Sequence, residues 1–117
     1  MLVENTDYFI KGEFKGQYLD ITKRGYYIDS LNEVNAPYYY IICMGEKPTG
    51  GYSLEISEVK KVNGKVEIIV KEISPSADAT VTQALTYPTI IVEFPKQQEN
   101  IVIKSTDGVE FPLLKDY

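Results

Sequence analysis

The chain has 117 residues, of which 44% are hydrophobic and 25% charged, and its net charge is −5. This length predicts a single domain, residues 1–117, that buries about two thirds of the surface of its unfolded chain. The acidic balance, with no basic patch, argues against electrostatic capture of nucleic acid or of an anionic membrane. No segment approaches the roughly 20 apolar residues of a membrane span, and the first residues lack a signal-peptide pattern.

The first third of the chain predicts short strands separated by glycines. These strands cover residues 8–14, 17–22 and 26–28, and their spacing is typical of a meander. Residues 29–34 carry cap-type residues and end before Pro37, which predicts at most one helical turn.

The middle of the chain contains the clearest strand signals. Residues 38–44 form a short apolar run, predicted to be a strand buried on both faces. Residues 52–62 and 65–73 flank Asn63-Gly64, which suits a type I′ hairpin turn. In the second arm aliphatic and charged residues alternate. Ile69 and Ile73 lie on the otherwise polar face, which predicts that part of this face is covered or forms an interface.

The last third predicts one central strand and a second hairpin. Residues 89–94 are rich in β-branched side chains and end at Pro95. Residues 101–104 and 109–114 flank a turn containing Asp107-Gly108, and Pro112 indicates an edge position. Short strands with turn signals between them predict an all-β fold, an antiparallel β-sandwich or barrel.

Catalytic chemistry is disfavoured by residue content. The chain has no His, which removes the commonest general base and the commonest transition-metal ligand. Its one Cys, Cys43, lies in an apolar run and is predicted to be a buried core thiol. Acidic pairs on the hairpin lack the even spacing that places two carboxylates on one strand face, and no calcium-loop array occurs. We therefore expect no catalytic residues, no metal and no cofactor.

The turn in residues 45–52, GEKPTGGY, is the most distinctive local feature. Pro48 fixes its own φ, and Gly50 and Gly51 allow positive φ, so this segment can hold an unusual backbone shape. It begins like a phosphate-binding loop. However, Gly51 and Tyr52 stand where that loop has Lys and Ser or Thr, and a strand is predicted where that loop continues into a helix. A nucleotide site is therefore excluded.

This turn, the hairpin after it and the string VTQALTYP at residues 81–88 together resemble the C-terminal domain of PrcB-like proteins. The resemblance covers residues 38–96, about half of the chain. It implies a small non-catalytic domain that binds a protein partner and supports a bacterial protease complex. It also implies an extracytoplasmic location, in the cell envelope or secreted.

Residues 47–52 alone are similar to the Asn-Pro-Thr-Thr-Gly-Tyr loop of chagasin-type cysteine protease inhibitors. Those inhibitors are immunoglobulin-like domains, which adds an immunoglobulin-like sandwich to the expected folds. Lys47 replaces the Asn and Gly50 the second Thr, and the chain has no Trp to complete the other inhibitory loops. Inhibition is therefore the alternative function, and a structural domain of a larger envelope assembly is a third.

The fifteen-residue connection over residues 74–88 is long for a compact β domain, and such ordered loops are functional or tightly packed. Two interpretations stay open: the connection packs against the glycine turn and pins it, or it contacts a partner. The sequence also allows a cis bond between Tyr87 and Pro88. The predicted partner-binding residues are Lys47, Pro48, Thr49, Gly50, Gly51, Tyr52, Thr82, Gln83 and Tyr87.

Overall fold

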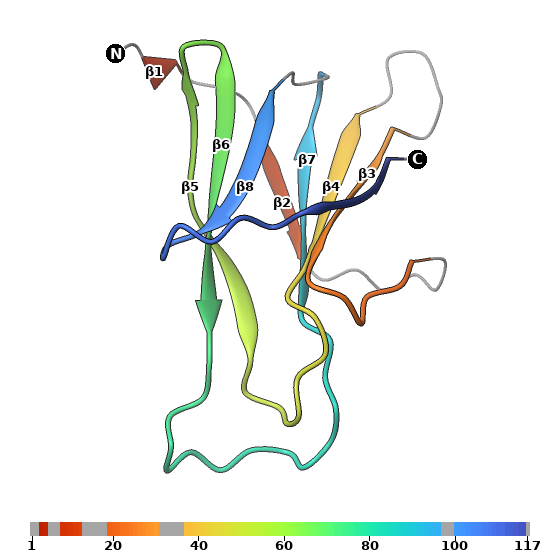
Figure 1. Ribbon diagram of the computed structural model, residues 1–117, viewed down its shortest axis with the longest axis vertical. Coiled ribbons are helices and arrows are strands. Elements are labelled where there is room, and N and C mark those ends of the chain that lie inside the picture. The colour runs from red at the N-terminus through yellow and green to blue at the C-terminus, as the bar shows by residue number, and fades with distance from the viewer. Residues whose placement is uncertain (1–2, 5–7, 13–18, 31–36, 97–99, 117) are drawn as a thin grey trace.

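The computed structural model describes residues 3–4, 8–12, 19–30, 37–96 and 100–116. Two β-sheets pack face to face, and the described residues contain no helix (Figure 1). The predicted all-β sandwich is therefore confirmed, as two separate sheets rather than one closed barrel. Its relation to immunoglobulin-like domains stays a prediction.

One sheet has the strand order β1-β5-β6-β8. Its strands are β1 (Val3–Glu4), β5 (Ser53–Val62), β6 (Lys65–Ile73) and β8 (Ile101–Ser105). The predicted hairpin of β5 and β6 is confirmed: Asn63 and Gly64 have φ values of 53° and 78°, as a type I′ turn requires. β8 pairs with β6 in parallel.

The other sheet has the order β2-β7-β4-β3-β9. Its strands are β2 (Phe9–Gly12), β7 (Thr89–Phe94), β4 (Tyr38–Cys43), β3 (Gly25–Asp29) and β9 (Leu113–Asp116). β4 is the central strand and pairs antiparallel with both β3 and β7, whereas β9 pairs with β3 in parallel. The predicted strands in residues 38–44 and 89–94 are therefore confirmed.

The core lies between the sheets because apolar side chains alternate along the inner strands. Val66, Ile68 and Val70 of β6 are almost fully buried. Opposite them, Phe94 meets Tyr40 edge to face, with ring centroids 5.4 Å apart and an interplanar angle of 89°. On the outer face of β6 the predicted exceptions Ile69 and Ile73 are half-buried.

A second apolar cluster covers the outer face of the β3/β4 pair. It contains Leu19, Tyr27, Ile41 and Cys43, and the Tyr27 hydroxyl donates to the Asp20 carbonyl at 2.7 Å. β4 is thus buried on both faces, as predicted. Burial, with a smaller contribution from the Asp20 carboxylate, raises the pKa of the Cys43 thiol to about 12.

The predicted meander in the first third is wrong. β2 and β3 are not neighbours, because β7 and β4 lie between them. Of the strand predicted at residues 17–22, residues 17–18 lie outside the described residues. Residues 19–22 form a turn rather than a strand, since the Thr22 N–H donates to the Asp20 carboxylate at 3.0 Å and this local bond replaces a ladder. The predicted helical turn at residues 29–34 falls mainly outside the described residues; Asp29 itself ends β3.

The predicted second hairpin is correct only next to its turn. The Ser105 N–H donates to the Val109 carbonyl at 2.9 Å and the Phe111 N–H to the Ile103 carbonyl at 2.8 Å. Beyond Phe111, which is buried in the core, the chain crosses to the other sheet and becomes β9. Pro112 lies at this crossing because it has no N–H to offer a ladder.

Arg24, just before β3, joins the two sheets to this crossing. Its guanidinium donates to the Glu72 carboxylate of β6 at 2.7 and 2.9 Å and to the Glu110 carbonyl at 2.7 Å. The same group lies 3.8 Å from the ring centroid of Phe111. One planar cation therefore links the start of β3 to β6 and to the crossing at residues 110–111, which are distant in sequence.

Replacement of Arg24 by Met should lower the free energy of unfolding by about 2 kcal/mol, because charge-assisted hydrogen bonds and a cation–π contact are lost from a partly buried group. Urea denaturation measures this change. Lys60→Met is the matched control: its Nζ lies 4.0 Å from a Glu67 oxygen, a contact that is weak in water, and should cost under about 1 kcal/mol. Equal losses in the two variants would contradict the role assigned to Arg24.

The Cys43 thiol should resist alkylation in the folded protein, because it is buried and its pKa is raised. Iodoacetamide labelling at pH 8, followed by mass spectrometry, should give almost no adduct in buffer and complete modification in denaturing urea. Rapid labelling of the folded protein would show that this face of β4 is open.

Candidate functional site

The two motif segments meet at one end of the sandwich. Residues 44–52 connect β4 to β5, and residues 74–88 connect β6 to β7; both lie at the lower end of Figure 1, away from the labelled chain ends. Strands from both sheets therefore deliver the two segments to a shared tip, defined as residues 46–52 and 81–88.

The turn needs glycine at particular positions. Gly45 and Gly51 have φ values of 91° and 90°, whereas Gly50 has no positive φ. A Cβ atom on Gly51 would lie 2.8 Å from the Pro75 Cβ and 3.0 Å from a Val81 methyl. Gly51 is thus required both for its conformation and for close packing against the second segment.

Backbone hydrogen bonds clamp the two segments together. The Lys47 N–H donates to the Thr86 carbonyl at 2.8 Å, and the Thr86 N–H donates to the Lys47 carbonyl at 2.9 Å. The Gly50 N–H donates to the Thr82 carbonyl at 2.9 Å. The connection therefore packs against the glycine turn and pins it, as one of the two sequence interpretations stated.

Side chains complete the clamp. The Thr86 hydroxyl donates to the Thr49 carbonyl at 2.7 Å, and the Tyr87 hydroxyl donates to the Glu46 carboxylate at 3.1 Å. This last bond favours the protonated phenol and raises the pKa of Tyr87. The Tyr87-Pro88 bond is trans, so the cis bond that the sequence allows is not adopted.

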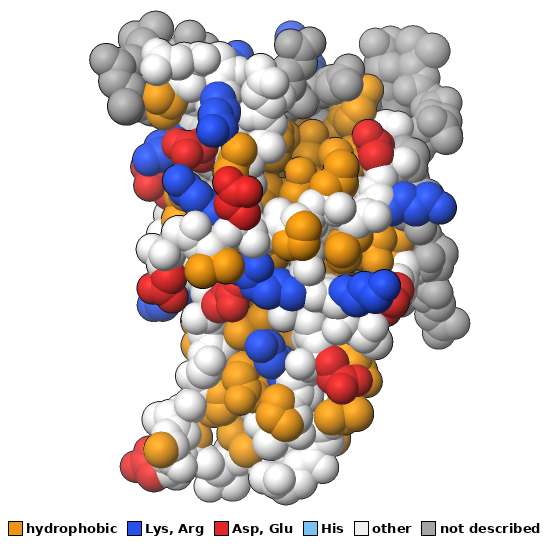
Figure 2. Space-filling view, viewed as in Figure 1, with side chains coloured by type: hydrophobic (Ala, Val, Ile, Leu, Met, Phe, Trp, Pro, Cys, Tyr) orange, Lys and Arg blue, Asp and Glu red, His pale blue; other side chains and the backbone are white. Residues whose placement is uncertain are grey.

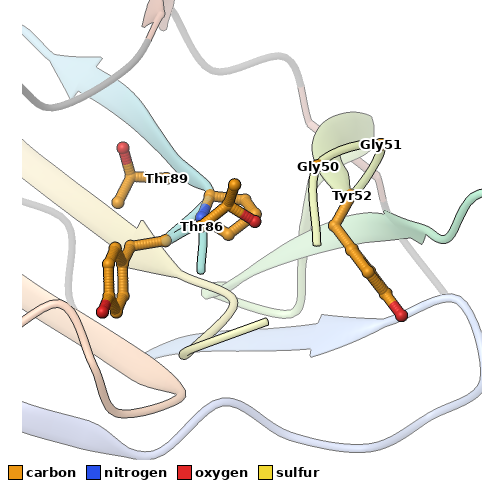
Figure 3. Close-up of a pocket in the computed structure, with 7 residues that line it drawn as sticks. Gly50, Gly51, Tyr52, Thr86 and Thr89 are labelled. Carbon is orange, nitrogen blue, oxygen red and sulfur yellow. The ribbon is translucent and has the colours of Figure 1, made fainter. Parts of the chain in front are cut away.

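A pocket of about 290 Å³ opens beside the clamp. Its lining consists of Gly50, Gly51, Tyr52, Thr86, Tyr87, Pro88 and Thr89. Figure 3 shows Gly50, Gly51 and Tyr52 on one side, and Thr86 and Thr89 on the other. The pocket therefore lies between the segments that lead into β5 and β7.

The outer surface of the tip mixes apolar and polar groups. Pro48, Thr82 and Gln83 are exposed, and Leu85 is 56% exposed. Gln83 makes no hydrogen bond to another described residue. Figure 2 shows hydrophobic side chains at the surface of this lower end, among polar ones.

All nine predicted partner-binding residues lie at this tip, although five of them also form the clamp: Lys47, Thr49, Gly50, Thr82 and Tyr87. The sequence analysis missed Leu85. The sequence did carry a signal for it. Leu85 is a large aliphatic residue in the connection at residues 74–88, where no predicted strand would turn its side chain toward the core.

Neither a metal centre nor a spanning helix is found in the part of the chain that the structure describes. No group of three or more His, Cys, Asp or Glu side chains there could hold a metal ion. In the same ranges no helix has the length and hydropathy to cross a membrane. The predicted absence of metal and cofactor stays a prediction.

Fold and site together define a small β-sandwich module that presents a clamped double-loop tip. Residues 38–95 match the family described as PrcB C-terminal, and this part of the chain belongs to that family. The match begins with β4 and ends just after β7, so it contains the whole tip and agrees with the resemblance found over residues 38–96. No curated protein and no solved structure gives a significant match to the chain.

Replacement of Gly51 by Ala should lower the free energy of unfolding by about 1–3 kcal/mol, because Ala is strained at this φ and its Cβ meets Pro75. Gly50→Ala is the control next to it. There the nearest atom to a Cβ is 3.4 Å away and φ is not positive, so the change should stay within about 1 kcal/mol. Thermal unfolding of both variants distinguishes them; a larger loss for Gly50→Ala would show that the turn has another shape.

Proposed function

We propose that the chain is a non-catalytic protein-binding module that serves as an accessory subunit of an extracytoplasmic bacterial protease complex. The PrcB C-terminal match supports association with such a complex. The lack of His in a chain with one buried Cys supports a role without catalysis.

The observation that carries the proposal is the clamped tip. The two segments are distant in sequence, and they are held in one shape by reciprocal backbone bonds between Lys47 and Thr86 and by the Gly50 N–H bond to Thr82. A surface already fixed in shape loses little conformational entropy when it binds. This arrangement favours recognition by shape rather than by folding on contact.

The composition of the tip also suits a protein partner. Leu85 and Pro48 offer exposed apolar contact, and Tyr52 adds an aromatic ring. Thr82 and Gln83 add exposed polar side chains to the same tip, and protein interfaces combine apolar centres with polar rims.

Inhibition of a cysteine protease is the second candidate, supported by the exposure of Pro48 and Gly51 at the end of the molecule. An inhibitory wedge requires such a position. Titration of papain with the purified protein tests this candidate: saturable loss of peptidase activity would favour inhibition over the accessory role.

Leu85→Asp should strongly weaken capture of the partner, because it places a charge at an exposed apolar position of the tip. A loss of apparent affinity of about tenfold or more is expected for a central contact. Affinity capture from envelope extracts of the native host, quantified by mass spectrometry, gives the partner and its retention. A protease or another envelope protein of the complex should be enriched by the unchanged chain.

Val109→Asp is the matched control, since Val109 is 57% exposed but belongs to the crossing between β8 and β9, outside the tip. It should retain the partner. Equal capture by both variants would place the interface elsewhere, and repeated capture of no protein at all would leave the chain a purely structural domain.

A further inference from the structure

The outer edge of β8 is only half covered. At the two ends of the β6/β8 pair, Asn100 and Thr106 bond to β6 with N···O distances of 3.2 and 3.1 Å. Alternate residues of a parallel strand bond to the same neighbour, so the odd-numbered residues 101, 103 and 105 turn their backbone groups away from β6. Residues 109–111 pair antiparallel with the lower part of this edge, at Ser105 and at the Ile103 carbonyl.

The upper part of the same edge carries unpaired backbone groups. After Phe111 the chain departs from β8 and runs across to β9 (Figure 1). The Ile103 N–H and both backbone groups of Ile101 have no hydrogen-bond partner among the described residues. Such groups on an edge strand are a template for a further strand. A strand added here would continue the line of residues 109–111, in the same antiparallel direction.

Apolar side chains lie partly exposed beside this upper edge. Tyr38 begins β4 and Ile101 begins β8 at the upper end of Figure 1, and both are only partly buried although they pack against the main core cluster. Ile28 of β3 does the same, and Leu113 of β9 is 49% exposed. Figure 2 shows hydrophobic side chains gathered on this face above the crossing segment. A strand with apolar residues at alternate positions would cover them with one of its faces.

A carboxylate at this opening selects the charge of the added strand. Asp116 is the register partner of Ile28, so its side chain lies on the same face of the sheet, and Lys115 before it lies on the other face. Burial raises the pKa of Tyr26 and of Tyr40, and the nearby Asp116 carboxylate adds to both shifts. A strand with Lys or Arg is therefore favoured. A second copy of this chain, with its net charge of −5, would bring the same carboxylate to the opening and be repelled.

We propose that the upper edge of β8 receives an extended basic segment of a partner protein. The segment pairs antiparallel with residues 101–103 and turns its alternate apolar side chains onto Ile28 and Tyr38. This inference goes beyond the proposed function, because it uses no residue of the tip and assigns a second contact surface toward the opposite end of the sandwich (Figure 1).

Three end-blocked peptides test the proposal on the full chain: KVTVTVK, the reordered KVVVTTK and the acidic EVTVTVE. Amide ¹H–¹⁵N spectra should show saturable shifts with KVTVTVK, concentrated at residues 28, 38 and 101–103. The other two peptides should bind at least about fivefold more weakly, because one lacks the alternation and the other the positive charge. No saturable shifts with KVTVTVK, shifts confined to other residues, or equal binding of all three peptides would overturn the proposal.

Hydrogen exchange gives a second readout on the same samples. The unpaired Ile101 amide should exchange at least about tenfold more slowly when KVTVTVK is bound, whereas the Val102 amide, which faces β6, should change little. Unchanged exchange at Ile101 in the bound state would overturn strand pairing. Protection of Ile101 that grows with protein concentration, without peptide, would reveal a second copy at this edge and overturn the choice of a basic partner.

Asp116→Lys should weaken binding of KVTVTVK about fivefold or more, because it reverses the charge at the opening. Glu55→Lys is the matched control: it makes the same charge change at an exposed position of β5, which β6 separates from β8. It should bind the peptide almost as the unchanged chain does, and so should Leu85→Asp at the tip. Equal weakening by Asp116→Lys and Glu55→Lys would overturn the assignment of Asp116 to the opening, and exchange at Ile101 in the unchanged chain decides the matter if a variant unfolds.

Discussion

The two sheets are joined by the passage of the chain from β8 to β9, and the Arg24 side chain anchors that passage through its hydrogen bonds and its contact with Phe111. Its guanidinium pairs with Glu72 in one sheet and covers Phe111 at the crossing, next to the start of β3 in the other. The same region supports the tip, because the Glu46 N–H donates to the Thr22 carbonyl at 3.1 Å and Gly45 packs against the Arg24 backbone. Core burial supplies the driving force, and this polar junction links β6, the crossing at Phe111 and the start of β3.

Local signals in the sequence were sufficient for the elements that pair with their neighbours in the chain. Asn63-Gly64 determines the turn between β5 and β6, and the apolar run before Gly45 determines a strand buried on both faces. Local signals were insufficient where a strand pairs with a strand that is distant in the sequence. β8 and β9 pair in parallel with strands that precede them by many residues, and no local pattern around Asp107-Gly108 separates a full hairpin from a short one that crosses sheets.

The candidate site was predictable as two strings but not as one surface. The order of residues in 45–52 and 81–88 indicated the family, now matched over residues 38–95. Their contact depends on long-range bonds such as Thr86 to Thr49, which no spacing rule reveals. The two adjacent glycines also looked equivalent in sequence, whereas of the two only Gly51 has a positive φ, and Pro75 and Val81 of the other segment lie close against it.

The crossing at Phe111 lies beyond the end of the family match, so the limits of the match differ from the limits of the two sheets. The segment that carries the family match ends just after β7, yet β3, β8 and β9 all lie outside it and supply strands to both sheets. Cut at those limits, the segment would lack the Arg24 junction and would expose inner faces that Tyr26, Ile103 and Phe111 normally cover. The segment that matches the family is therefore smaller than the unit that builds both sheets, because strands outside the match complete the sheets and the core between them.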